Sequence, residues 1–186
     1  IQEMFTSAAR PFYHSADMLE LKVIVPEIYI PFIVGHFEKR NRRIAPDDVV
    51  RVYNLFKGHT YYVQKTFNEA FADTPEGDEC TLQTLRAAID NMIASNDTIF
   101  REILSNIPEK QKELLYAIAK DGEAERITSA AFIKRHSLAS ASSVQSAVKK
   151  LLEKDIITEI NKVFSVTDKL FAMWMNRMYG ENKRLL

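Results

Sequence analysis

The chain has 186 residues, with 25 lysines and arginines against 25 aspartates and glutamates, so its formal net charge is zero. Hydrophobic residues make up 46% of it, which excludes wholesale disorder. No apolar run reaches the roughly 20 residues that cross a bilayer. The single cysteine, Cys80, excludes an internal disulfide. The lone thiol and the lack of a recognisable signal peptide predict a cytoplasmic protein with no membrane partner.

The charge is unevenly distributed along the chain. Residues 1–108 carry 11 basic and 15 acidic side chains, whereas residues 109–186 carry 14 and 10. The basic second half favours an anionic partner, although a mixed solvated surface would have the same composition.

The N-terminal 25 residues predict a helix followed by a strand. Apolar residues between 4 and 9 have helical spacing, and residues 18–25 pass from alternation into an apolar run. A single strand cannot satisfy its own backbone groups, and no partner strand is evident nearby. Because the chain also begins at Ile1 in mid-pattern, we expect it to be a piece of a longer protein.

Residues 26–107 predict an all-α bundle of four helices. The first begins at Pro26, and its expected inward face comprises Ile28, Ile30, Phe32, Ile33 and Phe37.

The other three helices of the bundle have recognisable ends. The second has Pro46 at its start and Gly58 just past its end. The third runs from His59 to about residue 72, and the fourth runs from Thr81 to about residue 104, with Asn96 as a candidate break.

Residues 108–186 predict three helices, a hairpin and a closing helix. Thr128 is expected to cap the second helix, and Ser140 or Ser142 the third. Only Asn161-Lys162 separates two short β-branched strands, which suits a tight hairpin. This is the order of elements in a winged-helix domain.

The closing helix is expected to be capped by Asp168. Its inward residues are predicted to be Leu170, Phe171, Trp174 and Met178. The chain is therefore predicted to be mainly α, a helical bundle followed by a winged-helix domain with a short β-hairpin.

Signatures of catalysis and metal binding are absent from the sequence. It contains no GxxxxGK[ST] phosphate-binding loop, no GxGxxG, no HExxH and no cysteine pair. We expect this chain alone to have no catalytic residue, cofactor or metal, and neither to bind ATP tightly nor to hydrolyse it.

The third helix of the predicted winged-helix domain is a candidate DNA-contact element. Its polar face and the hairpin tip carry Ser142, Ser143, Ser146, Lys149, Lys150 and Lys162. Serine and lysine contact phosphates, but the helix has no arginine, the residue that dominates guanine readout. DNA binding would therefore be mainly electrostatic and weakly sequence-selective, and docking of a protein partner stays open as the alternative.

The junction of the second and third bundle helices is a weaker candidate site. Gly58, His59 and Thr60 lie where polar groups at a helix N-terminus can approach a nucleotide. An ordinary glycine helix cap explains the same residues.

Several segments, in order, resemble archaeal-type AAA+ ATPases, which are relatives of the STAND NTPases. Residues 58–64 (GHTYYVQ) are similar to the Gly-x-Pro-x-Tyr-Leu element of the lid domain. Residues 110–119, 142–154 and 164–174 are similar to the opening, the third helix and the closing strand–Asp–helix–Trp pattern of that family's C-terminal winged helix.

The chain departs from that family pattern at two places. Thr60 stands where the family has proline, which weakens the inferred nucleotide contact. Residues 11–15 (PFYHS) lack the arginine of the Pro-Leu-Tyr-Gly-Arg motif that many members carry.

The resemblance implies a division of labour along the chain. Residues 1–25 would be a remnant of an upstream P-loop ATPase domain, residues 26–107 its lid, and residues 108–186 a winged-helix effector module. The full-length protein would bind and hydrolyse ATP with Mg²⁺. Its implied partners are its own P-loop domain and either DNA or a protein, and a homo-oligomer is possible.

The alternative is a winged-helix transcriptional regulator whose helical part dimerises or senses a ligand. A regulator should present a large self-complementary apolar patch on residues 26–107. A lid should instead present an apolar face toward the missing domain, close to the predicted strand.

Overall fold

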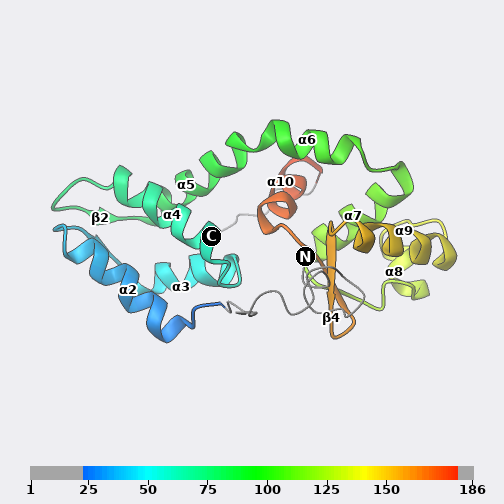
Figure 1. Ribbon diagram of the computed structural model, residues 1–186, viewed down its shortest axis with the longest axis horizontal. Helices are drawn as coiled ribbons and strands as arrows, with labels where there is room; N and C mark the ends of the chain where they lie inside the picture. Colours follow the sequence, from blue (N-terminus) through cyan, green and yellow to red (C-terminus); the bar gives the residue numbers. More distant parts are fainter. Residues whose placement is uncertain (1–22, 180–186) are drawn as a thin grey trace, which may run out of the picture.

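The computed structural model describes residues 23–179. They form two helical parts, and two consecutive helices run along the top of the view from one part to the other (Figure 1). The first part contains α2 (Pro26–Glu38), α3 (Pro46–Leu55), α4 (Thr60–Asp73), α5 (Leu82–Ser95) and α6 (Asp97–Ser105). The second contains α7 (Glu109–Asp121), α8 (Ala130–Arg135), α9 (Ala141–Glu153) and α10 (Lys169–Tyr179).

This architecture confirms the predicted fold class, mainly α with a helical bundle and a winged-helix arrangement. The helix and most of the strand predicted for the N-terminal 25 residues lie outside the described residues. Residues 23–25 are described, and they form no strand.

The helices of the first part begin and end at the residues that sequence rules favour. Pro26 and Pro46 occupy first turns, and the Thr81 hydroxyl caps α5 by accepting from the Thr84 amide at 3.2 Å. Asn96 does break the long fourth helix, and its side-chain amide donates to the Met92 carbonyl at 2.8 Å.

A short parallel pair, β1 (Arg43–Ile44) with β2 (Glu79–Cys80), joins two loops of the first part. Two residues are too few to show an alternation in the sequence, so this pair was not predicted.

The predicted inward face of α2 is partly wrong. Tyr29, Ile33 and Phe37 are buried, whereas Ile28 is 65% exposed and Phe32 is 50% exposed. Residues four apart share a helix face, so burying Tyr29, Ile33 and Phe37 turns Ile28 and Phe32 outward. Hydrophobic residues lie on more than one face of this helix, and composition alone could not choose between the faces.

The closing helix contains a smaller correction. Met178 is exposed, and Met173 and Met175 are buried in its place. The other predicted inward residues, Leu170, Phe171 and Trp174, are buried as expected.

The winged-helix part contains a three-stranded antiparallel sheet, in the order β3 (Ala124–Glu125), β5 (Val163–Val166), β4 (Ile157–Ile160). The hairpin was predicted, but the two-residue β3 was not. Ser129, rather than Thr128, caps α8, because its hydroxyl accepts from the Phe132 amide at 3.2 Å. Ser140 caps α9, and Asp168 caps α10 by accepting from the amides of Leu170 and Phe171.

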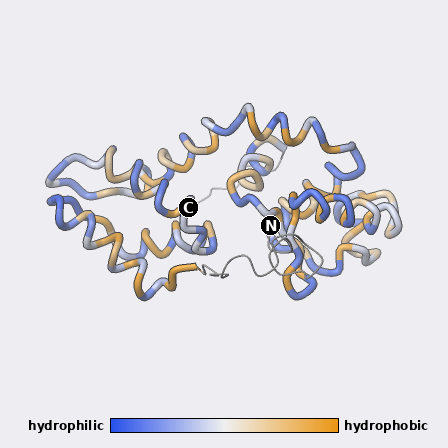
Figure 2. Tube along the Cα trace, in the orientation of Figure 1, coloured by the Kyte–Doolittle hydropathy of each residue, from blue (hydrophilic) through white to orange (hydrophobic). Residues whose placement is uncertain are grey.

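The last helix joins the two parts. α10 packs against α7 and β5 of the winged-helix part, and also against α5 and α6. Trp174 is only 2% exposed, and its ring lies 5.8 Å from the Phe100 ring of α6. Figure 2 shows apolar and polar residues alternating around the helices, and the buried apolar residues of both parts form one cluster.

The hairpin turn carries backbone strain that a substitution can test. Asn161 and Lys162 have φ values of 52° and 65°, as a two-residue turn of this kind requires, and glycine is favoured at the second position. Replacing Lys162 with glycine relieves about 1–2 kcal/mol of left-handed strain. Glycine also increases the conformational entropy of the unfolded chain, and this lowers the stability by about 0.4–1 kcal/mol.

We therefore expect Lys162→Gly to raise the free energy of unfolding by about 0.5–1 kcal/mol in a urea titration. Lys162→Ala is the matched control, because it removes the same charge but keeps a Cβ at positive φ. An equal gain in stability from both variants would contradict the strain argument.

Candidate functional site

A groove of about 730 Å³ lies between α9 and the hairpin, and we call it the α9–hairpin groove. Its apolar lining is contributed by the segment after β3, by α9 and by β5: Ile127, Val148, Leu152 and Phe164. Its charged lining comprises three basic and two acidic side chains: Arg126, Lys149, Lys162, Glu125 and Glu159. An apolar floor with a charged rim is typical of a binding groove.

The structure separates the six predicted DNA-contact residues into two groups. Lys149 and Lys162 line the α9–hairpin groove from opposite sides. Ser142, Ser143, Ser146 and Lys150 lie on α9 outside its lining.

The second group is partly engaged within the protein. The Ser142 hydroxyl lies 3.1 Å from that of Ser140, and the Ser143 amide is held by the same cap. Lys150 donates to Glu153 at 2.8 Å, which lowers the pKa of that carboxyl. DNA contact by these residues stays a prediction. Because Glu153 pairs with Lys150, the surface is less positive than its lysines alone would make it.

The apolar floor of the groove was missed from the sequence. The helical spacing of apolar residues in α9 predicts core positions for Val148 and Leu152, yet both are only half-buried and open onto the groove. The one sign of this floor in the sequence is Phe164, an aromatic residue in the strand that directly follows the hairpin turn.

The turn between α3 and α4 requires its glycine. Gly58 has φ 72°, and a Cβ at this position would lie 2.6 Å from the Tyr53 hydroxyl. His59 is exposed, and Thr60 opens α4. The structure thus supplies a structural reason for Gly58, and nucleotide contact by Gly58, His59 and Thr60 stays a prediction.

The same turn is connected to the start of α10. The Tyr62 ring stacks on Phe56, with centroids 5.4 Å apart, and lies tilted against His59, with centroids 4.7 Å apart. Its hydroxyl donates to Oδ1 of Asp168 at 2.7 Å. Burial, followed by the hydrogen bond to Asp168, raises the pKa of Tyr62 well above its usual value.

A second link joins the two parts at the same place. Lys57 forms an ion pair with Glu123, which lies between α7 and β3 and whose carboxyl pKa is lowered by this contact. Both side chains of this pair are largely exposed, so its contribution to stability is small.

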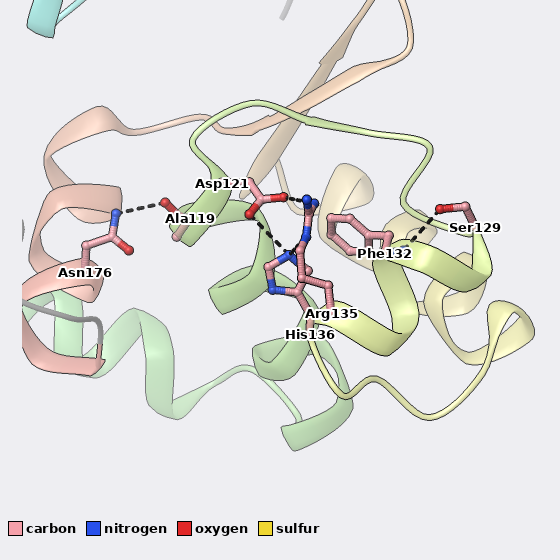
Figure 3. A network of polar contacts seen from close by, with 7 residues as sticks. All are labelled: Ala119, Asp121, Ser129, Phe132, Arg135, His136 and Asn176. Atoms are coloured by element: carbon pink, nitrogen blue, oxygen red, sulfur yellow. Dashed lines mark hydrogen bonds and ion pairs between the residues drawn. The ribbon is translucent and has the colours of Figure 1, made fainter.

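A polar network fixes the helices of the winged-helix part to one another (Figure 3). Nε2 of His136 lies 3.2 Å from Oδ1 of Asp121 at the end of α7, and the Arg135 guanidinium contacts the other carboxylate oxygen. Nδ2 of Asn176 in α10 donates to the Ala119 carbonyl at 2.8 Å. No group of three metal-binding side chains occurs among residues 23–179, and we interpret this network as structural.

A hydrophobic surface lies where the described chain begins, and we call it the α2 face. It comprises Val23, Ile24, Val25, Ile28 and Phe32, all exposed. Figure 2 shows the hydrophobic stretch that leads into α2. The Tyr53 hydroxyl donates to the Ile24 carbonyl at 2.8 Å and so holds this stretch against α3. None of the described helices is both long and apolar enough to span a membrane.

The Tyr62–Asp168 hydrogen bond predicts a pH dependence of stability. Tyr62 keeps its proton in the folded state above pH 10, where an unfolded tyrosine loses it. The folded state then binds more protons than the unfolded state, so this contribution falls as pH rises above about 10. We expect Tyr62→Phe to be about 1 kcal/mol less stable at pH 7 and to lose stability less steeply above pH 10.

Urea titrations between pH 7 and pH 11 measure both effects. Tyr61→Phe is the control, because Tyr61 is exposed and no hydrogen bond of its hydroxyl occurs within residues 23–179. Parallel stability–pH curves for Tyr62→Phe and the unsubstituted chain would contradict the assignment.

Comparison with known proteins supports both parts of the fold. Residues 98–177 match a family model described as a probable winged helix domain, and this match begins within α6. No curated protein sequence matches the chain.

The fold is similar to that of a solved structure, the Walker-type ATPase PABY2304 of Pyrococcus abyssi, with a TM-score of 0.63. The sequences are 13% identical, and the similarity covers 92% of this chain and 47% of that one, so the chain spans about half of that ATPase. The chain thus contains a winged helix domain and, over both of its parts, resembles the fold of an archaeal Walker-type ATPase.

Proposed function

We propose that this chain is the lid and winged-helix region of an ATP-dependent, AAA+-like P-loop ATPase. In this proposal ATP and Mg²⁺ bind mainly to a P-loop domain upstream of residue 23. The present chain closes against that domain and transmits its movement to the winged helix.

The observation that carries this proposal is the position of the α2 face. Three of its five exposed apolar residues end the segment that the sequence predicts as a strand, residues 18–25, and the other two, Ile28 and Phe32, lie on the helix that follows. Isolated exposed hydrophobic residues are ordinary, but five of them within residues 23–32 are a concentration that favours an interaction surface. A lid that packs on a domain connected to residue 23 would bury this group.

The similarity to the Walker-type ATPase supports the same proposal. It extends over 92% of the chain and so includes the bundle and the winged helix in the same order. A regulator with an unrelated sensing domain would be expected to resemble such an ATPase over the winged helix alone.

The contacts between the two parts supply a route for the movement. The lid turn at Gly58 is followed by Tyr62, whose hydroxyl holds the capping residue of α10. α10 then packs against α7 and β5 of the winged helix. A rotation of the lid would therefore displace the winged helix rather than be absorbed by a flexible linker.

The test is made on the full-length protein, whose upstream region should contain a P-loop lysine and should hydrolyse ATP. The double substitution Ile28→Ser with Phe32→Ser removes two apolar side chains from the proposed docking surface. Their burial would contribute about 3 kcal/mol or more to the free energy of docking. We expect ATP turnover to fall at least tenfold, whereas the matched pair Ile99→Ser with Ile160→Ser, also exposed but outside the α2 face, leaves it unchanged.

Two results would overturn the proposal. One is an upstream region without a P-loop that hydrolyses no ATP. The other is a stable dimer of the 186-residue chain, seen by analytical ultracentrifugation, that Ile28→Ser with Phe32→Ser converts to monomer. The second result would favour the transcriptional regulator.

A further inference from the structure

The α9–hairpin groove has a chemistry that does not suit a nucleic-acid backbone. Four apolar side chains line it, and three of them are only half-buried: Ile127, Val148, Leu152 and Phe164. Affinity for DNA comes mainly from phosphate contacts, which need donors and cations rather than an apolar floor. Apolar side chains of a peptide, by contrast, can fill such a floor and gain from leaving water.

The basic residues at the rim are available for a partner. Arg126, Lys149 and Lys162 form no ion pair with any residue in the range 23–179. They come from three separate segments, so they surround the floor rather than follow one helix. Lys150, which lies outside the groove, is by contrast paired with Glu153.

Two acidic residues, Glu125 and Glu159, share this rim. They would repel the continuous negative charge of a phosphodiester chain. A peptide avoids this repulsion because its acidic side chains can be spaced to meet the cations alone.

The backbone of the rim is held in an uncommon conformation. Arg126, Asn161 and Lys162 all have positive φ, at 47°, 52° and 65°. The two-residue hairpin turn requires these values at Asn161 and Lys162. Arg126 lies outside that turn, and a non-glycine residue in this region carries strain. At Arg126 and Lys162 the chain keeps a long cationic side chain where glycine would be less strained.

We propose that the α9–hairpin groove binds an amphipathic segment of a partner protein. Its apolar side chains fill the floor over Val148, Leu152 and Phe164, and its acidic side chains meet Arg126, Lys149 and Lys162. This inference goes beyond the proposed ATPase role and does not depend on it, because the groove belongs to the winged helix whatever domain lies upstream.

The first experiment finds a ligand. The 186-residue chain is immobilised and used to select from a phage-displayed library of random peptides, and an enriched sequence is synthesised with fluorescein. We expect enriched peptides to carry apolar residues at i, i+3, i+4 and i+7 together with aspartate or glutamate. Failure to enrich any peptide, or enrichment of basic ones, would overturn the proposal.

The second experiment locates the site by fluorescence anisotropy. We expect Lys149→Ala and Lys162→Gly each to weaken binding of the labelled peptide by about fivefold. Val148→Thr, which keeps the side-chain shape but adds a hydroxyl to the floor, should weaken it by a similar factor. Lys150→Ala is the matched control on the same helix and should leave the affinity unchanged.

The outcomes of these experiments distinguish peptide binding from DNA binding. Loss of binding in Lys162→Gly cannot arise from unfolding if that variant is the more stable one, as the turn geometry predicts. Peptide binding that none of the groove variants weakens would overturn the proposal. Low-salt binding of an unrelated DNA duplex, weakened equally by Lys149→Ala and Lys150→Ala, would also overturn it and would make α9 a nucleic-acid surface.

Discussion

The packing of α10 around Trp174 is the contact on which the rest of the structure depends. The indole N–H donates to Oδ1 of Asp97 at 2.8 Å, and Arg101 donates to the other carboxylate oxygen at 2.7 Å. Hydrogen bonds from Arg101 and then Trp174 lower the pKa of Asp97, which keeps the acceptor charged. The buried Trp174 side chain thus anchors α10, the last helix of the winged-helix part, to the first turn of α6.

This arrangement gives the two parts a shared core instead of a linker. Arg177 contacts Asp90 of α5, and the Phe171 ring lies 5.2 Å from that of Phe100. Inter-domain surfaces are usually more polar and allow relative motion. Here the apolar contact is continuous, so a force applied at the α2 face would reach the α9–hairpin groove through packed helices. The two proposed surfaces lie on different parts of one molecule and can be tested independently.

The sequence predicted the elements well and their faces less well. Helix ends were predictable because prolines, capping hydroxyls and Gly58 act locally. The three two-residue strands, β1, β2 and β3, were missed because pairing over so short a length depends on tertiary packing alone. The outward turn of Ile28 and Phe32 was missed because α2 is apolar on more than one face.

The candidate sites show the same limit. Lys149 and Lys162 were predicted as site residues from their polarity, but only Phe164 gave any sign in the sequence of the floor between them. Val148 and Leu152 have core spacing in the sequence, and only the position of the hairpin leaves them half-open. The domain boundary at residues 107/108 stays a prediction, because α6 packs with α10 and the family match already begins at residue 98.

The claim that both parts form one cooperative unit can be measured directly, because Trp174 is the only tryptophan in the chain. Its fluorescence reports the junction, and far-UV circular dichroism reports the helices of both parts. In a urea titration of the 186-residue chain we predict that the two signals change together, with one midpoint and one slope. A fluorescence transition at lower urea, with most of the helical signal retained, would show that the parts separate before they unfold and would contradict this account.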